Sequence, residues 1–208
     1  MVPVSPSVNA RMQEKREHIL ECALELFAER GYVNTPVKDI VDRSGYGTGT
    51  FYKYFSNKED VLKTMLSEFL EQIIAGVNEY FKQESDLYMR FVGAKMVMLD
   101  VFIQNEKLSE IYSRVVGVSS GEIDGCLSDF ESRFLQFTGK NISYGIKKGV
   151  FREVPVEPIA NAVLAVIKHA VCQWIVLKKI STEEMVEMVR SILESLALSL
   201  RSEGMKSE

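Results

Sequence analysis

The sequence is short of the residues that build metal centres and disulfide frameworks. Its 208 residues include three cysteines, Cys22, Cys126 and Cys172, which lie far apart and form no Cys-X-X-Cys pair. It has only two histidines, and no run of His, Cys, Asp and Glu has the spacing of a known metal motif. We therefore expect no metal, no cofactor and buried thiols, with a redox-sensing cysteine as the alternative.

Long apolar runs are also missing. The two longest, AVLAVI and AVCQWIVL, are separated by Lys168 and His169, so neither reaches the roughly 20 residues that cross a membrane. The first ten residues, MVPVSPSVNA, lack the basic and apolar segments of a secretory signal. These two absences predict a cytoplasmic protein that does not contact a membrane.

No segment alternates apolar and polar residues over a useful strand length, whereas helical periodicity is frequent, so we predict an all-α fold. Residues 1–10 hold two prolines and two serines without periodicity, which indicates a disordered arm. The first helix is expected from Arg11 to Arg30, ending at Gly31. Its apolar stripe consists of Ile19, Cys22, Ala23, Leu26 and Phe27.

Two short helices and one long helix are expected next. The segment PVKDIVDRS has Thr35 before it as a possible N-cap and Gly45 after it, where a positive φ would close the helix. TGTFYKYF is expected to form the third helix. Ser56 and Glu59 have the spacing of a capping box at the start of the long fourth helix.

The rest of the sequence is helical in pattern. We expect helices within about 86–148, over 159–177 and over 182–202, with a connector at 149–158. These expectations give an N-terminal helix-turn-helix domain (11–57) followed by a larger helical domain (58–208).

The sign of the charge changes along the chain. The net charge of −4 excludes a protein that is basic over its whole surface, but residues 43–58 contain Arg43, Lys53 and Lys58 and no acid. Because local charge governs the attraction of phosphate, this stretch is a candidate anion-binding surface.

The same stretch carries three glycines, Gly45, Gly47 and Gly49, for which two interpretations compete. A nucleotide-binding glycine loop needs a buried strand before it, and the Walker form also needs Gly-Lys-Ser/Thr. Here the preceding VKDIVDRS is helical in pattern, and no such triplet occurs. Two short helices joined by a glycine turn explain more of the residues and predict a helix-turn-helix.

The segment LELFAERGY…TPVKDIVDRSGYGTGTFYKYFSNKEDVL resembles the DNA-binding domain of the TetR family of bacterial transcriptional regulators. The resemblance is dense over residues 15–62, and its most specific part is GTFYKYFSNKEDVL. It departs from the family pattern in the turn, where Tyr46 replaces a small apolar residue and Gly47 removes the usual capping side chain. The operator sequence is therefore not predictable from the resemblance.

The resemblance implies roles for individual residues. Thr48, Thr50 and Lys53 would face base edges in the major groove, and the turn residues Tyr46 and Gly47 would lie beside them. Lys38 would approach a flanking base or phosphate. The implied phosphate contacts are Thr35, Tyr52, Tyr54 and Lys58, of which Lys58 also lies where a helix N-terminus favours anions.

The larger domain is expected to supply a dimer face and an effector site. The resemblance and the apolar surface of the last two helices favour a homodimer through a four-helix bundle, formed by Val163, Ile167, Val171, Trp174, Met188, Ile192 and Leu196. The middle helices are rich in methionine and aromatic residues, which could be core or could line a site for a small apolar or aromatic effector. The candidates are Met96, Phe102, Tyr112, Phe130, Phe134, Phe137 and Tyr144.

These features together predict a non-enzymatic regulator, most simply a repressor. It would bind a pseudo-palindromic double-stranded operator as a dimer and be released by its effector. Two alternatives remain open at this point: a helical enzyme, and an activator that responds to another protein.

Overall fold

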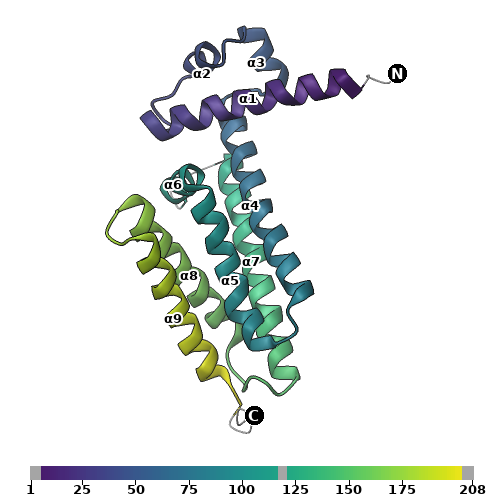
Figure 1. Ribbon diagram of the computed structural model, residues 1–208, viewed down its shortest axis with the longest axis vertical. Helices are drawn as coiled ribbons and strands as arrows, with labels where there is room; N and C mark the ends of the chain where they lie inside the picture. The colour runs from purple at the N-terminus through teal and green to yellow at the C-terminus, as the bar shows by residue number, and fades with distance from the viewer. Residues whose placement is uncertain (1–5, 117–120, 203–208) are drawn as a thin grey trace. The chain divides into compact units, whose positions relative to one another are not determined.

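The computed structural model describes residues 6–116 and 121–202, and these segments confirm the all-α fold. No β-strand occurs in them, and the isolated antiparallel bridge between Phe151 and Arg201 is the nearest approach to one. The chain forms two compact units, Met1–Ser67 and Glu68–Glu208, joined through a continuous helix, α4 (Figure 1).

The first unit is a small helical domain. Its elements are α1 (Pro6–Arg30), α2 (Val37–Ser44), α3 (Thr48–Tyr54) and the first part of α4 (Lys58–Gln83). The predicted stripe of α1 is buried, and it shares a core with apolar residues of the other three helices: Ile40, Val41, Phe51, Phe55, Val61 and Leu62. Burial of these side chains holds two helices of only eight and seven residues, which are too short to persist alone.

The starts of α1 and α4 differ from expectation. α1 begins at Pro6 rather than Arg11, because a proline in the first turn lacks only an N–H that would be unpaired there. Residues 1–5 of the expected arm lie outside the described residues. The cap of α4 is shifted by one residue: Asn57 Oδ1 accepts from the backbone N–H of Asp60 at 2.8 Å, and the Asp60 carboxylate accepts from Ser56. Ser56 and Glu59 therefore do not form the predicted box.

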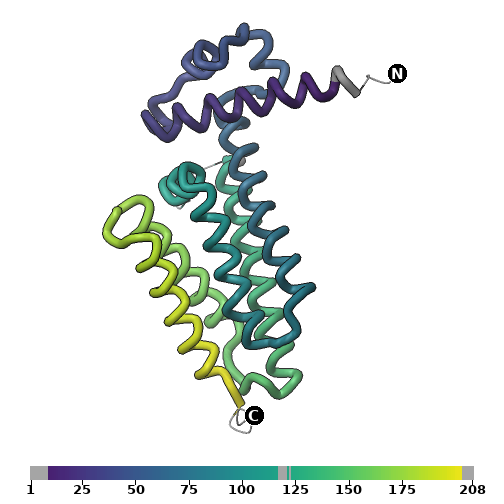
Figure 2. The backbone as a smooth tube through the Cα atoms, in the orientation of Figure 1, coloured from purple at the N-terminus to yellow at the C-terminus, as the bar shows by residue number. Residues whose placement is uncertain are grey.

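The second unit consists of the remaining turns of α4 and five further helices. These are α5 (Leu87–Gln104), α6 (Glu106–Val115), α7 (Gly121–Lys147), α8 (Val156–Val171), which continues as the π-helical turn η1 (Cys172–Val176), and α9 (Thr182–Leu200). α5 packs against α7 and α9, and α8 packs against both α7 and α9, so that α8 and α9 lie side by side and antiparallel (Figure 2). α6 is turned across the direction of its neighbours (Figure 1).

The segment Val156–Val176 is long and apolar enough to cross a membrane by length and composition. In the structure its stripe of Val163, Leu164, Ile167 and Ala170 is buried, and the helix packs against α7 and α9. Its hydropathy is thus that of a core helix covered by other helices of the same unit.

Candidate nucleic-acid interface and effector cavity

The outward face of α3 is polar and accessible. Phe51 and Phe55, one turn apart, are 1% and 2% exposed and fix the helix on the core. Thr48, Tyr52 and Lys53 are exposed on the other side, so this face offers a hydroxyl, a phenol and an ammonium group. Gly49 lies on the same face, and a Cβ built there meets no atom within 4 Å. Thr50 and Tyr54 are half-buried at its edges.

The turn before α3 is shaped by two glycines and contacts α1 through Tyr46. Gly45 has φ +68°, as predicted, and ends α2 in the left-handed conformation. Gly47 occupies the N-cap position of α3 without a side-chain hydrogen bond, as its lack of a side chain requires. Tyr46 is half-buried. Its ring meets the His18 ring edge-on, with the two ring centroids 5.6 Å apart, and the ammonium of Lys15 lies 5.7 Å from the centroid of the Tyr46 ring. Tyr46 therefore anchors the turn on α1.

Two ion pairs fasten α2 to the end of α1. The guanidinium of Arg43 makes two contacts with the Glu29 carboxylate, at 2.9 and 3.2 Å, and Arg30 lies 2.9 Å from Asp39. The acid-free stretch that contains Arg43 is thus partly neutralised by α1. Lys38 of α2 remains exposed.

Thr35 does not lie where a phosphate contact needs it. Its side chain is 0% exposed, and its hydroxyl donates to the carbonyl of Gly31 at 2.9 Å and approaches that of Leu26 at 3.4 Å. The hydroxyl also does not cap α2, whose N-cap residue is Pro36. The hydroxyl of Thr35 is thus used by the last turns of α1 and the loop after them, and Thr35 is not placed for a DNA contact.

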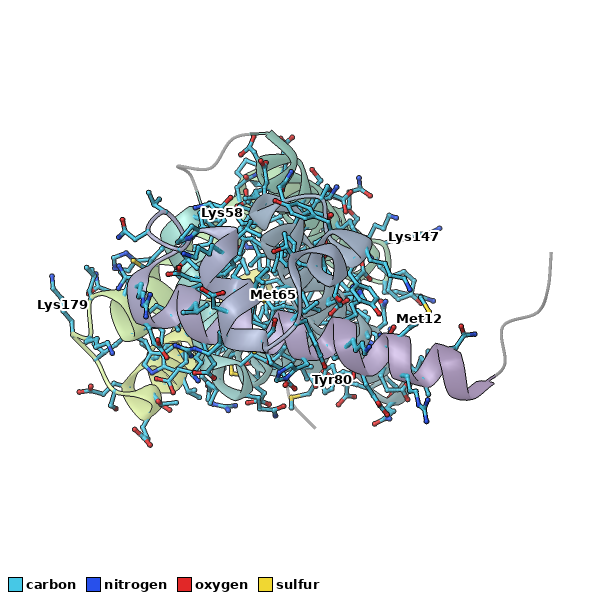
Figure 3. The ribbon with its side chains drawn as sticks, turned by 90° about the horizontal axis from the view of Figure 1, so that it is seen from above. Met12, Lys58, Met65, Tyr80, Lys147 and Lys179 are labelled. Atoms are coloured by element: carbon cyan, nitrogen blue, oxygen red, sulfur yellow. The ribbon has the colours of Figure 1, made fainter. Side chains whose placement is uncertain are left out.

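Lys58 is occupied in a similar way, although it lies at the start of α4 as predicted (Figure 3). Its ammonium donates to the backbone carbonyls of Tyr32, Val33 and Thr35 at 2.9, 3.0 and 3.1 Å. The same ammonium lies 4.7 Å from the centroid of the Tyr32 ring. Since an ammonium has three hydrogens, this geometry uses all of them on the loop between α1 and α2. Lys58 is therefore a positioning residue in this structure.

One contact of the first unit escaped the sequence reasoning. The thiol of Cys22 lies 3.7 Å from Nε2 of His18, the α1 residue whose ring also contacts Tyr46. The i, i+4 spacing of these residues was the signal that could have revealed the contact. Burial raises the pKa of the Cys22 thiol, so the thiolate is disfavoured. Among the described residues no group of three or more His, Cys, Asp and Glu is arranged to hold a metal ion.

The second unit contains a cavity of about 250 Å³ between α4, α5 and α7. Three of the predicted effector residues, Phe130, Phe134 and Phe137, line it. Its other walls are formed mostly by apolar residues of α4 and α5: Ile73, Ile74, Val77, Asn78, Ala94, Lys95 and Met98, with Arg133, Gln136, Thr138 and Lys140 added by α7. Arg133 is paired with Glu71 of α4.

The other predicted effector residues lie elsewhere. Phe102 and Tyr112 are buried, with ring centroids 5.4 Å apart, in an aromatic cluster with Phe69. Met96 does not line this cavity. Tyr144 is 46% exposed and lines a second cavity of about 350 Å³, which shares Phe137 and Lys140 with the first. Some of the predicted aromatic residues thus belong to the core and others line a cavity. Helical spacing alone did not distinguish the two groups.

The first cavity also holds polar groups that sequence reasoning missed. Lys95 is 1% exposed, and its ammonium has no hydrogen-bond acceptor among the described residues. Burial lowers the pKa of Lys95 to about 7. The hydroxyl of Thr138, which is 0% exposed, likewise lacks a partner within the described part of the chain. The signal was present in the sequence, because Lys95 lies four residues after Phe91 on the stripe of α5 that also carries Ala94 and Met98.

The expected dimer residues divide between two faces. Val163, Ile167, Val171 and Trp174 are at most 8% exposed within a single chain, so they belong to the core of the unit and not to its surface. The outward face of α8 instead carries Asn161, Ala162, Ala165 and His169. On α9, Ile192 is 42% exposed and Met188 and Leu196 are half-buried. An apolar face thus exists on α9. The residues that we expected α8 and η1 to contribute to the dimer instead face the core of their own chain.

Residues 19–65 match the family model described as bacterial regulatory proteins, tetR family. The crystal structure of a putative TetR-family transcriptional regulator from Syntrophomonas wolfei is 54% identical in sequence, with a TM-score of 0.81 over 89% of this chain and 96% of that chain. That match covers both units.

More distant relatives are similar over nearly the same length. The fatty acid metabolism regulator protein of Bacillus subtilis is 23% identical over 195 residues, which are 92% of this chain and 100% of that protein. The crystal structure of the transcriptional regulator FadR from Bacillus subtilis in complex with stearoyl-CoA is 22% identical, with a TM-score of 0.77 over 89% of this chain and 99% of that chain. At this identity the structural match shows a common fold.

Proposed function

Because the chain belongs to the TetR family of bacterial transcriptional regulators, we propose that it is a dimeric repressor that lays α3 in the major groove of its operator. The observation that carries this proposal is the outward face of α3, where Thr48, Tyr52 and Lys53 are exposed while Phe51 and Phe55 hold the helix from behind. We propose that the protein acts by changing transcription, in the cytoplasm, and that it has no enzymatic activity.

The contacts with DNA divide into two kinds. Thr48 and Lys53 face base edges, with Thr50 and Lys38 at the margin, and Gly49 lets the helix backbone approach the bases closely. Tyr52 and Tyr54 donate phenolic hydrogens to phosphates. Tyr46 and Lys58 set the position of the turn and of the loop that precedes α2.

The dimer forms through the outward faces of α8 and α9. Ile192 is the most exposed large apolar residue on the α9 stripe that also carries Met188 and Leu196. Ala162 and Ala165 on α8 are small, so a second helix pair can approach closely. Two such pairs make a four-helix bundle, and its twofold axis matches a pseudo-palindromic operator.

The effector is a small molecule with a mainly apolar body, held in the cavity between α4, α5 and α7. The aromatic wall of Phe130, Phe134 and Phe137 supports this proposal. The relatives from Bacillus subtilis, one named for fatty acid metabolism and one bound to stearoyl-CoA, favour an acyl compound. α4 contributes Lys58 to the first unit and Ile73, Ile74 and Val77 to the cavity wall, so a ligand that displaces α4 acts on both.

The proposal is tested by selecting bound fragments from random duplexes and measuring their affinity by fluorescence anisotropy at several salt concentrations. We expect an inverted-repeat site. Lys53→Met should weaken binding and lower the salt dependence by about one phosphate equivalent per protomer if Lys53 meets the backbone, or relax sequence preference if it meets a base. The matched control is Lys147→Met, an exposed lysine of α7 that should leave binding unchanged.

Three results would contradict the proposal. Catalytic turnover that survives Lys53→Met would favour a helical enzyme. Binding that strengthens on addition of a partner protein, with raised transcription, would favour an activator. Equal affinity for every duplex, unaffected by Lys53→Met, would remove the operator-reading role of α3.

A further inference from the structure

The cavity between α4, α5 and α7 is lined by two buried polar groups, on Lys95 and Thr138, that have no hydrogen-bond partner among the described residues. Lys95 is 1% exposed and Thr138 is 0% exposed, and both line the cavity. Neither the ammonium nor the hydroxyl has a hydrogen-bond partner among the described residues. The nearest aromatic contact of the ammonium is the face of Phe91, 4.4 Å from Nζ to the ring centroid. A buried ammonium without an acceptor is disfavoured unless another group supplies one.

From this geometry we propose that Lys95 and Thr138 bind the carboxylate of an apolar effector whose body lies against Phe130, Phe134 and Phe137. This inference rests on the proposal that the cavity is the effector site, and it adds the chemical class of the ligand. A carboxylate supplies acceptors for both the ammonium and the hydroxyl and neutralises the buried charge.

The surrounding charges favour an anion over a cation at this place. Arg133 and Lys140 are the other charged residues that line the cavity, and both are cationic. Arg133 is paired with Glu71 of α4, and Lys140 is exposed. Burial is the cause that lowers the pKa of Lys95 to about 7, with no contribution from a carboxylate within the described residues. The buried site therefore has no counter-ion among the residues that the structure describes.

The size of the cavity limits the ligand. A cavity of about 150 Å³ is sufficient for benzene, so 250 Å³ corresponds in proportion to roughly ten non-hydrogen atoms. Octanoate has this size and combines an alkyl chain with a carboxylate. A longer chain would have to extend beyond this cavity, and Phe137 and Lys140 also line the neighbouring cavity of about 350 Å³. We therefore choose octanoate as the probe, and octanol and octanoyl-CoA as comparison ligands.

Calorimetric titration of the full-length protein with octanoate tests the inference directly. Lys95→Met keeps the apolar stem and removes the ammonium, and it should weaken octanoate binding roughly 10- to 100-fold, the equivalent of one charged hydrogen bond. Thr138→Val should weaken it less, by roughly 3- to 10-fold. Octanol should bind wild type and Lys95→Met within about threefold of each other, since it carries no charge to neutralise. Lys147→Met, outside the cavity, is the control.

Proton uptake gives a second readout that a purely structural role of Lys95 would not produce. With a pKa of about 7 before binding, Lys95 is about half protonated at pH 7, and a bound carboxylate should restore its proton. Titrations in buffers of different ionisation enthalpy should show uptake of about half a proton per octanoate at pH 7. This uptake should vanish in Lys95→Met and persist in Lys147→Met.

Each outcome decides between explanations. Equal affinity for octanoate and octanol, without proton uptake, would overturn the carboxylate assignment. Preference for octanoyl-CoA, abolished by Lys95→Met and without uptake, would overturn it in favour of a thioester carbonyl. If octanoate binds as expected but leaves operator affinity unchanged, the carboxylate site stands and the proposed release mechanism fails. If operator release occurs with octanol alone, the release mechanism stands and the role of Lys95 fails.

Discussion

Replacement of Lys58 by methionine separates two roles that a lysine at the start of α4 can have. In the structure its ammonium donates to three carbonyls of the loop between α1 and α2, at 2.9, 3.0 and 3.1 Å. Hydrogen bonds from a charged donor contribute about 1.5–3 kcal/mol each, but here they share one half-buried ammonium that water can also solvate. We therefore expect Lys58→Met to destabilise this loop by about 2–3 kcal/mol in total.

Hydrogen exchange measures this loss locally. The N–H of Thr35 donates to the carbonyl of Tyr32 at 3.3 Å within the same loop, so its exchange reports opening of that segment. A loss of 2–3 kcal/mol corresponds to exchange that is roughly 30- to 150-fold faster in Lys58→Met than in wild type. Operator affinity should fall because the second helix loses its support, while the slope of log affinity against log salt should not change.

Lys53→Met should give a different pattern, because we propose that its ammonium meets a base edge. Lys53 is exposed on α3, so its removal should leave exchange and stability unchanged and should relax sequence preference at one position of each half-site, at a cost of about 1–3 kcal/mol. The positioning role of Lys58 would be refuted if Lys58→Met preserved exchange at Thr35 and lowered the salt slope instead. Such a result would mean that the ammonium leaves the three carbonyls and grips the duplex.

Three further predictions concern other parts of the molecule. Gly49→Ala should stabilise the first unit by up to about 1 kcal/mol in urea unfolding, because the added Cβ meets no atom within 4 Å. The same substitution should weaken operator binding at least tenfold, and tighter binding would contradict a close approach of DNA to this residue. Ile192→Asp should produce monomers in analytical ultracentrifugation, whereas Leu198→Asp, exposed on another side of α9, should remain dimeric; dimers in both would exclude this face. The pKa of Lys95 is about 7 in the folded chain against an ordinary value of 10.5, so between these pH values the unfolded chain binds more protons than the folded chain. The free energy of unfolding of the wild type should therefore rise relative to that of Lys95→Met between pH 7 and pH 10. Parallel pH profiles of the two free energies in urea unfolding would contradict the buried ammonium.

The sequence was sufficient for features set by neighbouring residues. The stripe from Ile19 to Phe27, the positive φ of Gly45 and the uncapped start of α3 at Gly47 follow from helical periodicity and from the stereochemistry of glycine. The exposed positions of Thr48 and Lys53 follow from the burial of Phe51, within α3, and of Phe55, the C-cap residue that ends it.

Features decided by distant residues could not be predicted in this way. A threonine before proline has the local pattern of an N-cap, but the hydroxyl of Thr35 is taken by the carbonyl of Gly31, in the turn after α1. Lys58 was expected at a phosphate because a helix N-terminus favours anions, whereas carbonyls more than 20 residues earlier occupy it. Local rules do not register competitors that only the tertiary fold brings close.

The face of α8 shows a different limit. This helix is apolar almost all round, so periodicity does not determine which stripe faces its own chain and which faces a partner. The structure places Val163 and Ile167 inward, leaving the smaller Ala162 and Ala165 outside. Residue size does not separate the two stripes either, because the small residues Ala160 and Ala170 are buried beside Val163 and Ile167. Only the packing of α8 against α7 and α9 decides which stripe faces the core.

The small size of the cavity constrains how an effector can release the operator. To shift a two-state equilibrium from 1:99 to 99:1, a ligand must favour one state by about 5.5 kcal/mol. A ligand of roughly ten non-hydrogen atoms, at about 0.3–1.5 kcal/mol per atom, has about 3–15 kcal/mol of binding free energy in total. Much of that free energy must therefore differ between the two states, so we expect the cavity to be closed, or Lys95 and Thr138 to be inaccessible to the ligand, when the operator is bound. The carboxylate site that we propose at Lys95 and Thr138 is suited to such a difference, because a small displacement of α5 against α7 is enough to break a hydrogen bond that a buried ammonium strongly requires.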